Sequence, residues 1–184
     1  DQLKSLQIVY PPLDAWLKSF MFDQALFGNF CRVIYLDADT LPVSEAFTEL
    51  LTLPPSIAFA SSRMPIYTYK CREAPALNTG VMVARPNSTV FEIMQRRIRE
   101  AWAFDDEFII ATQNFDQSWL DLFWRHFSPR IDVEQPITNF SDLFQETAEG
   151  PRVFAPSSGR SELPPHLVLP SAYNLFVDDF HMDL

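Results

Sequence analysis

A short strand-like segment, Cys31 to Leu36, ends in an apolar run from Val33 to Leu36 and leads directly into Asp37 and Asp39. A continuous apolar run of this length predicts a central β-strand buried on both faces, because an exposed face would carry polar residues at every second position. The two carboxylates follow at the carboxyl end of that strand, which is where α/β sheets bind ligands. The run therefore constrains both the fold and the place of a site.

Helix-like and strand-like segments alternate along the rest of the chain. Apolar residues at helical spacing predict helices at residues 13–28, 44–51 and 86–102, and a last helix for which Asp116 is the N-cap. Apolar runs predict strands at residues 6–10, 57–60 and 77–84, with short strands and loops after residue 129. This alternation predicts one α/β domain over residues 1–184, with a mixed central sheet flanked by helices.

Composition and charge exclude several function classes. Only 4 Gly residues are present, and the chain has neither a G-x-G-x-x-G motif nor a Walker loop, which argues against a glycine-loop nucleotide site. The formal net charge of -10 argues against binding to nucleic acid, which attracts basic surfaces. An acidic chain that binds an anionic substrate needs a cation at the site, and a carboxylate-bound metal supplies one.

The Asp-x-Asp pair is compatible with two kinds of chemistry. Asp37 and Asp39 would together hold one hard divalent cation, which would neutralise a leaving diphosphate. An apolar strand followed by Asp-x-Asp-x-Thr is also how haloacid-dehalogenase-type phosphohydrolases begin, with Asp37 as nucleophile and Asp39 as general acid. Those enzymes also need a downstream Lys and a later acidic pair after another strand, and the later predicted strands have neither. In a third, structural alternative the two residues only cap a turn and a helix.

Four segments, taken in order, resemble glycosyltransferase family eight, the group that includes glycogenin and galactinol synthase. Residues 32–41 resemble its metal-binding segment, and residues 77–83 resemble its Phe-Asn-Ser/Thr-Gly-Val strand. Residues 115–118 resemble its Asp-Gln segment, and residues 169–174 its Leu-Pro-x-x-Tyr-Asn segment. Lys18 resembles a Lys that begins the family's helix before the metal strand.

The resemblance implies a GT-A-type, Rossmann-like fold that transfers a hexose from a UDP-sugar to a hydroxyl acceptor with retention of configuration. It implies Mn²⁺ as cofactor, with Mg²⁺ as the alternative, bound by Asp37 and Asp39. It places Asp116 beside the anomeric carbon, with Gln117 next to it, as the catalytic pair. The donor-binding residues that it implies are Lys18, Leu36, Ala38, Asn78, Thr79 and Gly80.

The same residues have simpler structural alternatives. Lys18 would be an ordinary solvated helix residue, and Asp116 would only cap its helix. Asn78 would satisfy backbone groups beside a bulge, where Gly80 would relieve crowding.

The family usually begins with a strand that holds the nucleotide base, and it carries a late segment whose His completes the metal site. Neither segment occurs in this sequence. We therefore expect residues 1–184 to lack both ends of the catalytic domain, including the third metal ligand. A truncated, non-catalytic transferase-like domain is the corresponding alternative.

No stretch of the sequence is long and apolar enough to cross a bilayer, so we expect no transmembrane segment. The compartment stays open between the cytosol and the Golgi lumen. The sugar, the acceptor and the oligomeric state stay open as well.

Overall fold

The computed structural model describes residues 13–38, 40, 45–64, 77–103, 106, 115–133 and 152–170. The strand predicted at residues 6–10 lies outside these ranges, as does Asp39, the second carboxylate of the Asp-x-Asp pair. In the described part of the chain no helix combines the length and the apolarity of a membrane span.

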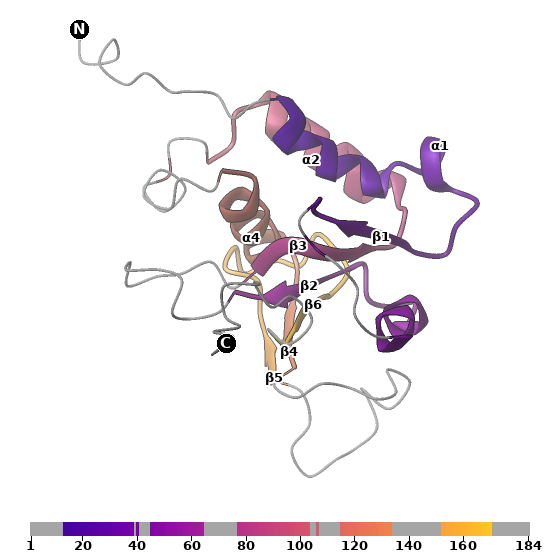
Figure 1. The fold of residues 1–184 in the computed structure, drawn as a ribbon. Coiled ribbons are helices and arrows are strands. Elements are labelled where there is room, and N and C mark those ends of the chain that lie inside the picture. The colour runs from indigo at the N-terminus through magenta and orange to yellow at the C-terminus, as the bar shows by residue number, and fades with distance from the viewer. Residues whose placement is uncertain are drawn as a thin grey trace, which may run out of the picture.

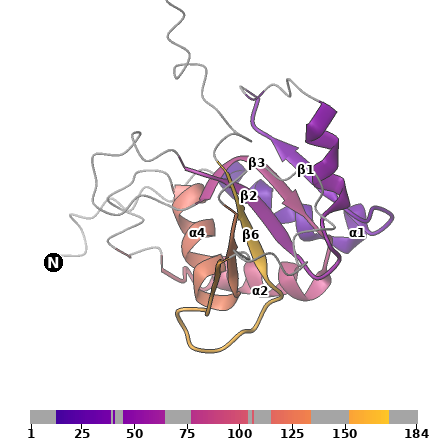
Figure 2. The same cartoon turned by 90° about the horizontal axis from the view of Figure 1, so that it is seen from below.

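Among the described residues, six strands form one mixed sheet in the order β1-β3-β2-β6-β4-β5 (Figures 1 and 2). The strands are β1 (Val33–Leu36), β2 (Phe59–Arg63), β3 (Leu77–Ala84), β4 (Arg130–Asp132), β5 (Arg152–Phe154) and β6 (His166–Leu169). β2, β6 and β4 are parallel to one another, whereas β3 is antiparallel to both β1 and β2, and β5 is antiparallel to β4. The predicted mixed α/β architecture is confirmed at this level.

Helices cover both faces of the sheet (Figure 1). The helices are the 3-10 helix η2 (Leu13–Phe22), α1 (Gln24–Phe27), the 3-10 helix η3 (Glu45–Thr52), α2 (Ser88–Arg99) and α4 (Phe115–Phe127). Met82 of β3 packs in one core with side chains of η2, α2 and α4, while its neighbours Val81 and Val83 pack in a second core with η3. Successive strand residues point to opposite faces, so β3 is buried on both sides.

The helix α4 packs its aromatic face against the sheet. Trp119, Phe123 and Phe127 recur every fourth residue and are almost fully buried. Trp124 stacks on Phe59 of β2, with ring centroids 4.8 Å apart. Because the helix already begins at Phe115, the predicted N-cap, Asp116, lies inside the first turn instead. An acidic residue there still interacts favourably with the helix dipole.

The other predicted helices differ from the structure at their ends. Asp23 accepts a hydrogen bond from the Ala25 N–H at 2.8 Å and starts α1, so the predicted helix at residues 13–28 is divided in two. The helix predicted at residues 86–102 is α2, which Asn87 caps through the Val90 N–H and which ends before Ala101, a residue with a φ of 51°. A left-handed residue cannot continue a right-handed helix, so the prediction that α2 reaches residue 102 is wrong.

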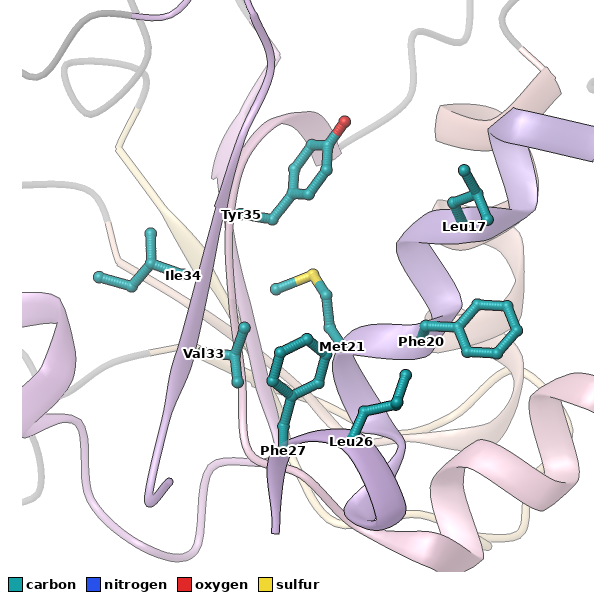
Figure 3. A pocket seen from close by; sticks show the side chains of 8 residues that line it. All are labelled: Leu17, Phe20, Met21, Leu26, Phe27, Val33, Ile34 and Tyr35. Atoms are coloured by element: carbon teal, nitrogen blue, oxygen red, sulfur yellow. The ribbon is translucent and has the colours of Figure 1, made fainter. Parts of the chain in front are cut away.

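The strand β1 is the last strand on its side of the described sheet, and its residues are half-buried. Its residues are therefore half-buried rather than buried on both faces as predicted, and among the described residues β1 is not a central strand. Figure 3 shows why the run is apolar nonetheless: Val33 and Tyr35 point toward η2 and α1, whereas Ile34 points to the other side of the strand. Each face of β1 meets a core, although among the described residues only β3 pairs with it.

Candidate active site

The antiparallel pairing of β1 with β3 places Asp37 beside the start of β3. The register sets Leu36 opposite Val81, and the Asp37 N–H continues the ladder by donating to the Gly80 carbonyl at 2.9 Å. In an antiparallel pair the carboxyl end of one strand meets the amino end of the other. For this reason the Asp37 and Asn78-Thr79-Gly80 segments, which lie far apart in sequence, are neighbours.

A bulge in β3 directs its first residues toward Asp37. The pairing with β2 passes from Met82 opposite Ser61 to Asn78 opposite Ser62, so residues 79–81 are additional on the β3 side. The Asn78 side chain holds this bulge by accepting the Gly80 N–H at 2.8 Å. Bulges beside functional sites commonly reorient a side chain, and here the reoriented side chain is that of Thr79.

Lys18 of η2 brings the polar side chains together. Its ammonium group contacts Asp116 Oδ2 at 2.8 Å and Asp37 Oδ1 at 3.2 Å, and it donates to Thr79 Oγ1 at 3.0 Å. These three oxygens match the three N–H donors of an ammonium group. The Lys18 side chain is only 10% exposed, so the alternative that it is an ordinary solvated helix residue is wrong.

Among the residues that the structure describes, the charges at this point do not balance. Two carboxylates, Asp37 and Asp116, share one ammonium group, and their side chains are 35% and 25% exposed. The excess negative charge faces solvent at the end of β1. A further cation would be attracted to this position.

The side chains of Gln117 and Asn78 fix the backbone of β3 beside the site. Gln117 Oε1 accepts the Thr79 N–H at 3.1 Å, so the residue after Asp116 is tied to the residue that contacts Lys18. The amide nitrogens of Asn78 and Gln117 lie 3.3 Å and 3.6 Å from the Met64 sulfur. Both amides are buried, which suits residues that position their neighbours. The alternative that Asn78 satisfies backbone groups beside a bulge is confirmed, whereas its contact with a donor stays a prediction.

The structure thus brings most of the predicted site residues together. Lys18, Asp37, Thr79 and Asp116 are in direct contact, and Asn78, Gly80 and Gln117 join them through the bulge and the backbone. Leu36 is half-buried and packs against the second core, and Ala38 is exposed beside Asp37.

The residues present fit a hard divalent cation better than zinc. Within the described ranges, no group of three or more His, Cys, Asp or Glu side chains could hold a metal. Magnesium and similar ions need only one or two protein carboxylates when water and phosphate complete the shell. The Lys18 ammonium group already lies among three oxygens, which shows that the surroundings stabilise positive charge. Zinc sites, in contrast, are typically built from nitrogen or sulfur ligands, and the described residues of this cluster contain none.

An apolar pocket of about 560 Å³ lies next to the site, between η2 and β1 (Figure 3). It is lined by Leu17, Phe20, Met21, Leu26, Phe27, Val33, Ile34 and Tyr35. Tyr35 links the pocket to the polar cluster, because its ring centroid is 5.1 Å from Lys18 Nζ. This lining offers no cationic group for a charged diphosphate, and its polar side-chain group is the Tyr35 hydroxyl, so the polar cluster is the better candidate site.

A second charged group lies at the same edge of the sheet and was missed in the sequence. Arg130 makes two hydrogen bonds to Asp132, at 2.5 and 2.6 Å, and Arg63 contacts the same carboxylate at 3.2 Å. The hydrogen bonds to Asp132 raise the pKa of Arg130. Asp132 ends β4 and Arg63 ends β2, so their contact depends on the strand order. No spacing in the sequence indicates the contact between Arg63 and Asp132.

Comparison of the chain with protein-family models, with curated proteins and with solved structures found no match. The resemblance to glycosyltransferase family eight therefore rests on the sequence segments alone. The geometry of the Lys18 cluster is an independent observation that bears on the same residues.

Proposed function

We propose that this chain carries the donor-binding and catalytic centre of a metal-dependent, retaining glycosyltransferase with a GT-A-type fold. It would move a hexose from a UDP-sugar to a hydroxyl acceptor. The observation that carries the proposal is that the carboxylates of Asp37 and Asp116 both contact the ammonium nitrogen of Lys18, and neither lies more than 3.2 Å from it. These residues lie on η2, after β1 and on α4, and their order along the chain does not require them to meet.

Each residue has a role that its surroundings support. Asp37, together with Asp39, would hold the divalent cation, whose chemistry is to neutralise the diphosphate as it leaves. Lys18 adds a fixed positive charge at the same place, where a diphosphate would carry its negative charge. Asp116 presents a partly exposed carboxylate. Thr79 links the two helices at the site, because its hydroxyl accepts from Lys18 and its N–H donates to Gln117, the residue after Asp116.

The test is UDP-sugar turnover, by transfer or hydrolysis, in the presence of Mn²⁺. We expect Asp37→Asn and Asp116→Asn each to reduce turnover by about a hundredfold or more, since each removes charge at the reacting centre. Asp23→Asn is the matched control, because it makes the same change in charge outside the site and Asn also caps helices. Turnover that survives in Asp37→Asn, or that is lost equally in Asp23→Asn, would contradict the proposal.

One observation favours a second candidate, the phosphohydrolase. The Asp37 carboxylate lies beside the Lys18 ammonium group, which would hold a phosphate against a carboxylate nucleophile. The same variants decide between the two by comparing phosphate-ester hydrolysis with UDP-sugar turnover. If only the phosphate ester is hydrolysed, and Asp37→Asn abolishes that reaction, the chain is a phosphohydrolase. Metal-dependent UDP binding with no turnover would instead indicate a non-catalytic domain.

A further inference from the structure

We propose that the Lys18 ammonium group is an internal counter-ion, which competes with a divalent metal for Asp37 until a nucleotide diphosphate binds. Metal binding and nucleotide binding would then be coupled through this one side chain. The inference rests on the proposed function and adds to it how the same site is regulated.

The first step is the coordination of Lys18. Each of its three N–H donors has an oxygen acceptor, on Asp37, Thr79 and Asp116. The Tyr35 ring lies 5.1 Å away and stabilises the same positive charge through its face. Without metal, the ammonium group therefore already offsets one of the two carboxylate charges, and it does so next to Asp37.

The second step is the competition. A divalent cation bound to Asp37 would come within a few ångströms of Lys18 Nζ, which is 3.2 Å from the Asp37 oxygen. Two positive charges that close repel strongly near a protein surface. Asp37 is the partner that Lys18 gives up more easily, because its contact is longer than the 2.8 Å contact to Asp116 and its side chain is more exposed.

The third step is the nucleotide. A diphosphate brings at least two negative charges, so the metal and the ammonium group each gain a partner when it binds. A nucleotide that relieves the repulsion between the metal and the ammonium group raises the affinity of the site for the metal. This coupling is reciprocal, so the bound metal raises the affinity for the nucleotide by the same factor. Lys18 thus disfavours metal alone and favours metal together with nucleotide.

The experiment is a Mn²⁺ titration of the whole chain, followed by the electron paramagnetic resonance signal of free Mn²⁺, with and without UDP. Lys18→Gln and Lys18→Met remove the charge, whereas Lys18→Arg keeps it. Arg96→Gln is the matched control, since it removes one charge from an exposed position on α2. Far-UV circular dichroism establishes that each variant is folded, and either neutral variant suffices.

Without UDP, we expect the neutral Lys18 variants to bind Mn²⁺ about tenfold more tightly than the unmodified chain. Lys18→Arg and Arg96→Gln should bind it as the unmodified chain does. Addition of UDP should tighten Mn²⁺ binding more in the unmodified chain than in the neutral variants.

Two results would overturn the inference, and they differ in what they say of the function. If UDP promotes Mn²⁺ binding but the neutral variants bind Mn²⁺ no more tightly without UDP, Lys18 is not a competing counter-ion and the proposed function stands. If no variant binds Mn²⁺ with or without UDP, both proposals fail.

Discussion

His166 provides a prediction for which the structure supplies a magnitude. The side chain is fully buried, and its pKa is lowered from 6.5 to about 3, first by burial and then by the charge of Arg130. Arg125 acts in the same direction, whereas Asp132 partly opposes the shift. Within the described part of the chain, His166 Nε2 has no hydrogen-bond partner, so a proton there would be a buried, unpaired charge.

The stability of the fold should therefore fall when the solution is acidified. Folded His166 stays neutral down to about pH 3, whereas in the unfolded chain it takes up a proton below 6.5. The unfolded state then binds more protons, so its free energy falls relative to the folded state as the pH falls. At about 1.4 kcal/mol for each pH unit below the unfolded pKa, acidification from pH 7 to pH 5 should cost about 2 kcal/mol through this residue.

The assay is urea unfolding at both pH values, with His166→Asn as the comparison. The Asn amide does not titrate, and it can replace the ring nitrogen that lies 3.0 Å from Ser128 Oγ. All other titrating groups are common to the two proteins, so the difference in pH dependence reports on His166. If both proteins lose the same free energy of unfolding between pH 7 and pH 5, the reasoning is refuted.

Two further predictions concern stability. Asn87→Ala should lower the free energy of unfolding by about 1 kcal/mol, because the Val90 N–H loses its capping acceptor; urea unfolding measures this, and Asn87→Ser, which keeps a cap, should cost less. Phe123→Ala should cost about 3–5 kcal/mol, since the ring is fully buried, whereas Leu51→Ala at a 47% exposed position should cost under about 1 kcal/mol. Equal losses for Phe123→Ala and Leu51→Ala by thermal unfolding would contradict the assignment of the core.

Local patterns predicted several elements well. The apolar run at residues 77–84 is β3 with the same bounds, and the helix predicted to begin at residue 86 is α2, which begins at Ser88. The 57–60 prediction is displaced, because β2 begins only at Phe59 and extends to Arg63. Its later residues include two serines, Ser61 and Ser62, which are buried and bond to carbonyls of β3. Polarity alone therefore placed the end of this strand too early.

Some features of the candidate site also follow from local sequence, whereas others depend on the tertiary structure. The sequence by itself determined that Asp37 follows an apolar strand and that Asp116 lies at the start of an aromatic helix, since both depend on neighbouring residues. Only the tertiary structure decided that β1 ends the described sheet, and that one Lys18 ammonium group joins Asp37, Thr79 and Asp116. The physical reason is that such contacts follow from the register of β1 on β3, the bulge in β3 and the packing of η2 and α4 in a common core. Those features depend on segments far apart in the chain, which no local pattern encodes.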